Sequence, residues 1–384
     1  MMSLLKQESF LLVALAFAVL SFLFEHTLLE QGQFVSMIAA CALIVVIVMA
    51  STRVAHHAEI LAHKVGDPYG TMILTLSAVA VEVLILAIMM GSSSSPTLVR
   101  DTIYSAVMLD INGIIGLAAL LGGLRHGEQP YNDDSSRTYS AMILTAMGIS
   151  MIVPEFIPEA KWHYYSAFTI FAMIALYALF LKMQVGTHSY FFSYSYRSQT
   201  AAAAPAPTAS GTSPSATAEK PRSKPVAQTE AEHESATVSI AVILIGVLII
   251  GFLAEFMSAF LNEGLEGTGA PPALMAVIVA SISAAPEILT ALRAALKNRM
   301  QSVVNIAMGA SLSTVILTVP VMEAIALYTG QPFIMAMTPV QTVMVAITLI
   351  VAAINLNDGQ TNAIEGMTHF VLFATFVMLT VLGL

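Results

Sequence analysis

The chain has 384 residues, of which 57% are hydrophobic and only 10% are charged, and its formal net charge at pH 7 is -9. Soluble domains carry about a quarter charged residues, so this composition excludes an ordinary soluble protein. The single cysteine, Cys41, excludes an intramolecular disulfide framework and a thiolate metal site.

Apolar stretches of membrane-spanning length, about 20 residues each, recur along almost the whole sequence. The first follows Lys6 without a small-residue cleavage motif, so we interpret it as a retained helix rather than a signal peptide. The sequence therefore predicts an all-α polytopic membrane protein with about eleven transmembrane helices. The predicted spans are 9–25, 33–53, 70–91, 101–124, 138–156, 164–185, 238–261, 271–292, 301–328, 334–354 and 367–384.

Basic residues accumulate on the cytoplasmic side of membrane proteins, and this rule orients the chain. With a cytoplasmic N-terminus, only Arg100 and Lys161 of the 15 lysines and arginines fall outside. The pattern predicts a cytoplasmic N-terminus and an external C-terminus.

A polar stretch divides the predicted spans into two groups. It is rich in Ala, Pro, Ser and Thr, and proline recurs too often for a helix. We predict an extra N-terminal helix (1–30), a first five-helix repeat (31–197), a disordered cytoplasmic linker (198–236) and a second five-helix repeat (237–384). Because five is odd, the second repeat begins on the opposite face, as in inverted-topology repeats.

One glutamate lies inside an apolar span of each predicted repeat. Glu82 ends the run Ala-Val-Ala-Val-Glu, and Glu287 ends the run Ala-Ala-Pro-Glu. A carboxylate in the hydrocarbon layer is costly and usually marks an ion pathway. Two of them in matching places predict one cation- and proton-binding site where the repeats meet. The alternative is a pair of protonated, hydrogen-bonded structural carboxyls, which the matched placement disfavours.

The proline before the second glutamate predicts an interrupted helix. Pro286 lacks a backbone N–H and obstructs the preceding turn, so a carbonyl near Ser283 is expected to be free. Irregular backbone in a membrane persists where it is buried in protein or lines a cavity. A carbonyl beside a carboxylate is a hard-oxygen ligand set that suits Ca²⁺, Na⁺ or a proton.

Each repeat opens with a helix that carries one further acidic residue near its end. We interpret Glu59 and Glu255 as acidic entrances on opposite sides of the membrane. For Glu59, an interfacial charge near Arg53 and Lys64 remains an equal alternative.

The histidines beside this first acid form a cluster. His56 and His63 share a helical face with Glu59, at spacings of three and four residues that are typical of a metal site or a pH sensor. We predict a regulatory role for them on the cytoplasmic side, with a simple interfacial cluster as the alternative.

Several neutral polar residues lie well inside the spans. We expect them to supply oxygens to the site or to hold its glutamates, whereas the alternative is that they mediate helix packing. These supporting residues are Asn112, Asn305, Ser283, Ser311 and Ser313. Asp110 is a further intramembrane member of this supporting group, and the sequence assigns it no more specific role.

These motifs resemble the cation/Ca²⁺ exchanger superfamily, and within it the bacterial calcium/proton antiporters of the ChaA type. The resemblance runs from about residue 30 to the C-terminus, and is strongest around His57-Ala58-Glu59 and Ala285-Pro286-Glu287. It implies two inverted five-helix halves with Glu82 and Glu287 as the essential acids, and Glu59 and Glu255 as a secondary pair. Both repeats depart from the plant-type Gly-Asn-Ala-x-Glu motif. The resemblance therefore identifies neither the neutral ligands nor whether the site selects Ca²⁺, Na⁺ or K⁺.

The expected function is Ca²⁺ export in exchange for protons by alternating access. The alternatives are a Na⁺ or K⁺/proton antiporter on the same scaffold and, in a different class, a cation channel. An intramembrane hydrolase is disfavoured because His-Glu-x-x-His is absent, so we expect no enzyme activity and no cofactor. The expected partners are the lipid bilayer, Ca²⁺ and protons, with no nucleic acid; the oligomeric state is left open.

Overall fold

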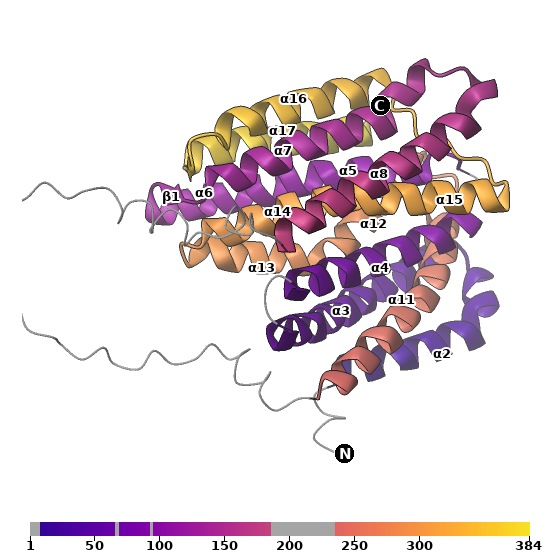
Figure 1. Cartoon of the computed structure of the whole chain (residues 1–384). Coiled ribbons are helices and arrows are strands. Elements are labelled where there is room, and N and C mark those ends of the chain that lie inside the picture. Colours follow the sequence, from indigo (N-terminus) through magenta and orange to yellow (C-terminus); the bar gives the residue numbers. More distant parts are fainter. Residues whose placement is uncertain (1–7, 66–68, 93–94, 186–234) are drawn as a thin grey trace, which may run out of the picture.

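The computed structural model describes residues 8–65, 69–92, 95–185 and 235–384. The predicted linker 198–236 lies almost entirely outside these residues and stays a prediction. Within them the chain is helical, apart from short connections and one pair of two-residue strands (Figure 1).

The first half begins with a helix that precedes the repeat. Its elements are α2 (Ser9–Leu29), α3 (Gln33–Val65), α4 (Tyr69–Ser92), α5 (Leu98–Met108), the π-helix η1 (Leu109–Ile114), α6 (Ile115–His126), strand β1 (Gln129–Pro130), α7 (Asp133–Met147), the π-helix η2 (Gly148–Ile152), the short 3₁₀ helices η3 (Val153–Phe156) and η4 (Glu159–Lys161), and α8 (Trp162–Val185).

The second half repeats this order. Its elements are α11 (Ala236–Leu265), α12 (Pro272–Ser283), α13 (Ala285–Leu296), α14 (Met300–Ser313), the π-helix η6 (Thr314–Thr318), α15 (Val319–Thr329), α16 (Pro339–Asn355), strand β2 (Gln360–Thr361) and α17 (Ala363–Val381). In both halves a long helix is followed by the glutamate-bearing segment, then by a helix interrupted by a π-helix, then by two more helical segments.

Eight helical segments of the described chain are long and apolar enough to cross a membrane, and the bent pair α12–α13 makes a ninth. Two shorter apolar segments, Thr75–Gly91 and Pro339–Asn355, lie at the third and tenth predicted spans. The all-α polytopic fold is therefore confirmed, whereas the count of eleven stays a prediction.

The helices that open the two halves, α3 and α11, pack against each other. A Cβ atom added at Gly246 would meet Val54, and one added at Gly264 would meet Met37. Late residues of one helix thus face early residues of the other, so the pair is antiparallel, as inverted repeats require. Helix α2 packs on both, and the three lie together at the lower side of Figure 1.

Polar contacts join the halves at both ends of the bundle. At the start of α5, Arg100 forms a buried ion pair with Asp101 and donates to the carbonyl oxygen of Ala336, while Gln341 of α16 donates to Asp101. At the other end, where β1 pairs with β2, Gln301 of α14 accepts a hydrogen bond from the backbone N–H of Asn132 and donates one to the hydroxyl of Ser135 on α7. A charged side chain joins the halves at this end too, where Arg137 of α7 donates to the side-chain and backbone oxygens of Asn357.

Helices α6 and α17 approach so closely that only glycine fits at their contact. A Cβ atom on Gly366 would lie 2.7 Å from the carbonyl carbon of Ala119 and 2.8 Å from the carbonyl oxygen of Gly116. Such distances to backbone atoms are not relieved by side-chain rotation, so the two helices would have to move apart.

We expect Gly366→Ala to destabilise the protein by about 1–3 kcal/mol or more, because overpacking forces backbone shifts. Gly148→Ala is the matched control, since a Cβ there meets nothing within 4 Å. The melting temperatures of the two purified variants in detergent measure this difference. Equal melting temperatures would show that α6 and α17 are not tightly packed.

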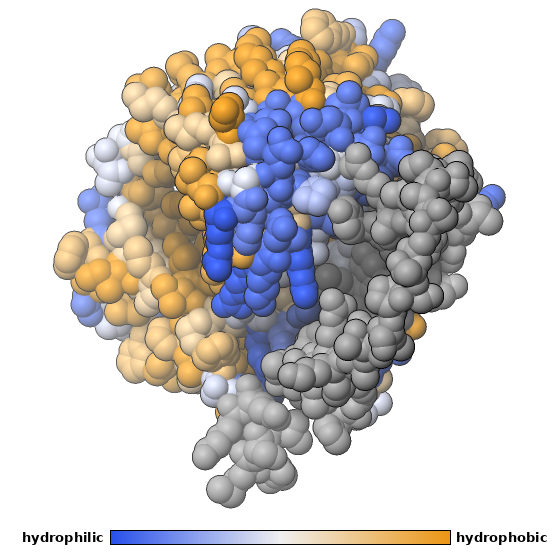
Figure 2. Space-filling model, turned by 90° about the vertical axis from the view of Figure 1, so that its left-hand side faces the viewer, coloured by the Kyte–Doolittle hydropathy of each residue, from blue (hydrophilic) through white to orange (hydrophobic). Residues whose placement is uncertain are grey.

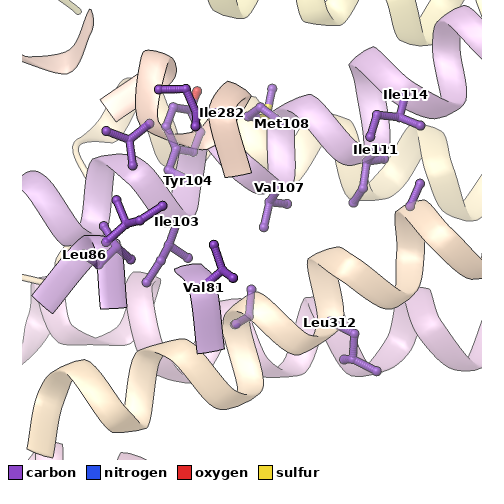
Figure 3. Packing of buried hydrophobic residues seen from close by; sticks show 14 of the residues in the cluster. Val81, Leu86, Ile103, Tyr104, Val107, Met108, Ile111, Ile114, Ile282 and Leu312 are labelled. Carbon is purple, nitrogen blue, oxygen red and sulfur yellow. The ribbon is translucent and has the colours of Figure 1, made fainter. Parts of the chain in front are cut away.

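The buried apolar side chains are sequence neighbours of the polar residues described below. Figure 3 shows Val81 of α4, Val107 of α5, Ile282 of α12 and Leu312 of α14 gathered in one region. At the end of the molecule that lies at left in Figure 1, hydrophilic residues lie near the centre, and hydrophobic residues lie to the left of them and above them in Figure 2. This distribution is expected when the hydrophobic sides face lipid and the hydrophilic centre faces water.

Candidate ion-binding site

Glu82 lies on α4 and is oriented by the interrupted helix of the other half. Its side chain is buried, with 6% of the residue exposed. Its Oε2 accepts hydrogen bonds from the hydroxyls of Thr314, at 2.9 Å, and Thr318, at 3.2 Å. Both threonines belong to the π-helix η6, a distortion that is frequent at functional sites.

Glu287 lies where the eighth predicted span breaks. Helix α12 ends at Ser283, α13 begins at Ala285, and their axes differ by 57°, which confirms the interruption predicted from Pro286. The glutamate occupies the first turn of α13, where backbone N–H groups without helical partners favour a negative charge. Its Oε2 is buried, and no described residue donates a hydrogen bond to it.

Asp110 brings a third carboxyl to the same place. It lies in the π-helix η1 with 2% of the residue exposed, and its Oδ2 accepts a hydrogen bond from Ser311 at 3.1 Å. It is close enough to Glu287 and Glu82 for the three charges to interact. The two π-helices η1 and η6, one from each half, therefore both lie beside the glutamates.

These carboxyls line one small cavity between the halves. Its remaining walls are mainly alanines, and its polar lining consists of Glu82, Asp110, Ser283, Glu287, Ser313 and Thr314. The cavity volume of about 30 Å³ has room for one or two water-sized occupants. In the described part of the chain no three His, Cys, Asp or Glu side chains converge as a metal-binding group. A cation here would thus use hydroxyl, carbonyl or water oxygens as well.

The predicted supporting serines lie in or beside this cavity. Ser283 and Ser313 line it, and Ser311 holds Asp110. The hydroxyl of Ser313 donates to the carbonyls of its own helix, at Gly309 and Ala310. Its lone pairs therefore stay available toward the cavity.

The two asparagines are not among the residues that line the cavity, and the supporting role expected of them stays a prediction. Asn112 donates to Thr348 at 2.7 Å, and its Oδ1 lies 3.0 Å from Nδ1 of His369. It follows Asp110 by two positions, which turns it to nearly the opposite side of the helix. Asn305 accepts a hydrogen bond from Gln301 at 2.9 Å and is likewise absent from the lining.

The secondary acids lie outside the cavity. Both Glu59 and Glu255 are exposed on the bundle. Because α3 and α11 run antiparallel, with Val54 opposite Gly246, the two acids differ in depth by roughly 20 Å at 1.5 Å per residue. This placement agrees with entrances on opposite sides, and their role stays a prediction.

In the histidine cluster, the buried member is His57 rather than the predicted pair. Its Nε2 lies 3.0 Å from Glu8, which also accepts hydrogen bonds from Arg53, and its Nδ1 faces Ser239 of α11. Burial by itself would raise the pKa of Glu8, but the hydrogen bonds and charges of Arg53 and His57 hold that pKa below its usual value. The side chain of His63 lies outside the described residues, and the regulatory role of His56 and His63 stays a prediction.

Sequence reasoning misses two residues that shape the site, Thr314 and Thr318, and it gives Asp110 no more than a supporting place. An intramembrane aspartate is itself a signal for a functional site. For the threonines no pairing signal exists in the sequence, because their partner lies more than 200 residues away.

Comparison with known proteins decides the family. The model of the sodium/calcium exchanger protein family matches residues 34–186 and 238–382, which is most of the chain. The chain belongs to the sodium/calcium exchanger family. The two matched stretches fall within the two predicted repeats.

Relatives of this exchanger carry different substrate names. It is 31% identical to the sodium-potassium/proton antiporter ChaA of Escherichia coli over 86% of each chain. It is 24% identical to the Ca²⁺/H⁺ antiporter ChaA of Bacillus subtilis, over 88% of this chain and 89% of the relative. Its fold is similar to that of the Ca²⁺/H⁺ antiporter YfkE, with a TM-score of 0.72, 18% identity and coverage of 97% and 99% of the two chains. The exchanger is thus an integral membrane cation antiporter.

Proposed function

We propose that this exchanger exports Ca²⁺ from the cytoplasm in exchange for protons by alternating access. The observation that carries the proposal is the cavity in which Glu82 of the first half meets Glu287 of the second, with Asp110 beside them. The same oxygens that bind the cation also bind the protons, so the two kinds of cargo compete for one site.

The chemistry of the lining favours a hard divalent cation. Ca²⁺ takes six to eight oxygen ligands, and carboxylates raise its affinity. Three carboxyls supply more negative charge than one monovalent ion neutralises. The hydroxyls of Ser283, Ser313 and Thr314 add neutral oxygens to the same cavity.

Competition between the cation and protons explains obligatory exchange. Ionised carboxylates without a cation are costly in a site surrounded by apolar side chains. The site therefore crosses between its two accessible states either with Ca²⁺ bound or with protons bound. Exporting Ca²⁺ moves two charges against an inside-negative potential, and two imported protons cancel that cost.

A second candidate is Na⁺ or K⁺/proton antiport through the same cavity. The name of the Escherichia coli relative, which is the more similar of the two curated relatives, favours it. We propose further that the N-terminus is cytoplasmic and the C-terminus external in a bacterial inner membrane, and that the protein is a transporter without enzyme activity or cofactor.

Inside-out vesicles that contain the protein, acidified inside and loaded with a pH dye, test the proposal. We expect micromolar Ca²⁺ added outside to release protons from the vesicles. Release with Na⁺ or K⁺ but not with Ca²⁺ would support the second candidate. Ca²⁺ entry that continues without a proton gradient or counter-ion would indicate a channel.

A further inference from the structure

A fourth carboxyl, Glu323, is buried outside the cavity. It lies on α15 with 2% of the residue exposed, and its Oε2 has no hydrogen-bond donor among the described residues. The side chain of Ser166 on α8 hydrogen-bonds it. Since α8 belongs to the first half and α15 to the second, Glu323 lies at a junction between the halves.

Among the described residues, no basic side chain forms an ion pair with Glu323. On α8, Tyr165 is within electrostatic reach, and its hydroxyl donates to the carbonyl oxygen of Ile149. On α4, which also packs against α15, the titratable group is Glu82, and Thr318 of η6 holds it. A buried carboxylate without a cation is costly, so such a group is tolerated in a membrane where it binds protons.

Helix α15 connects this carboxyl to the ion site. It continues directly from η6, so one uninterrupted helical stretch joins Glu323 to the threonines that hold Glu82. Glu323 follows Thr318 by five residues, roughly 8 Å along the helix axis. Exchange of the ion or proton bound at Glu82 changes its hydrogen bonds with the threonines of η6. If α15 is displaced as a result, the contact between Glu323 and Ser166 of α8 changes as well.

We propose that Glu323 is a further proton-binding carboxyl of the exchange cycle. The inference rests on the proposed function and adds one proton to it. In one state Oε2 takes a proton from water and the carboxylate becomes a neutral acid; in the other state the O–H bond breaks and the proton returns to water on the opposite side. With two protons exchanged against Ca²⁺ at Glu82 and Glu287, and the charge of Asp110 unchanged between the two states, each cycle then imports three protons for one Ca²⁺, a net inward movement of one charge.

The count of protons decides how transport responds to the membrane potential. Three protons per Ca²⁺ make 100 mV, inside negative, raise the equilibrium Ca²⁺ gradient about 50-fold, whereas two protons leave it unchanged. We therefore expect this dependence for the wild-type protein in liposomes with a potassium-clamped potential. Glu323→Gln should still exchange Ca²⁺ for protons but lose the roughly 50-fold effect.

Two further variants complete the test. Glu323→Asp keeps the carboxyl and should restore the dependence on potential, and Glu155→Gln, on the exposed η3, should keep it entirely. The proposal is overturned if Glu323→Gln keeps the wild-type dependence. It is also overturned if the equilibrium Ca²⁺ gradient of the wild-type protein does not respond to the membrane potential. This second outcome does not depend on the folding of any variant. Absence of any Ca²⁺-dependent proton movement by the wild type would instead contradict the proposed function.

Discussion

Replacing Glu287 with glutamine should abolish cation-coupled proton movement while the protein still inserts into the membrane. Glutamine keeps the size of the side chain in the first turn of α13, but it removes both the charge that binds the cation and the group that takes the proton. Losing one partner of a buried charged interaction costs about 3–5 kcal/mol, which corresponds to at least a roughly 100-fold loss of transport. Proton release from acidified vesicles at micromolar Ca²⁺ measures it.

The matched control for this variant is Glu266→Gln, which makes the same change at an exposed position at the end of α11. It should transport at the wild-type rate. Near-normal exchange by purified Glu287→Gln would contradict a site in which both repeats contribute an essential carboxyl.

Asp110→Asn should weaken the binding of Ca²⁺ much more than the binding of Na⁺ or K⁺. The change removes one of the three charges around the cavity, and the affinity of Ca²⁺ sites follows the number of charged ligands. We expect the Ca²⁺ concentration that gives half-maximal proton release to rise about 10- to 100-fold. Asparagine keeps an oxygen that Ser311 can donate to, so the local fold is retained.

Ser311→Ala separates charge from orientation. It removes the donor to Asp110 but leaves the carboxyl in the cavity, so its effect on Ca²⁺ should be clearly smaller than that of Asp110→Asn. Equal half-maximal Ca²⁺ concentrations for Asp110→Asn and the wild type would show that Asp110 does not bind the cation.

Hydropathy and spacing located the two glutamates because depth in a membrane can be read from position along an apolar span. The interruption at Pro286 could also be predicted from the sequence, because a missing N–H acts locally. The direction in which each side chain faces around its helix could not be predicted. Asp110 and Asn112 have nearly the same depth, yet one faces the cavity and the other faces Thr348 and His369. Direction depends on the partner helices and on the π-helices, which hydropathy does not report.

The π-helices also determine which changes in chain length the exchanger tolerates. A π-helix accommodates an extra residue in a turn, so deleting one residue from η1 would let the helix become regular without breaking it. The rest of α6 would then rotate by about 100° relative to Asp110. Gly116 would leave its contact with α17, although every chemical group of the site remained in the sequence. In η1 and η6, the two π-helices that carry residues of the site, insertions and deletions of single residues should therefore be more damaging than most substitutions.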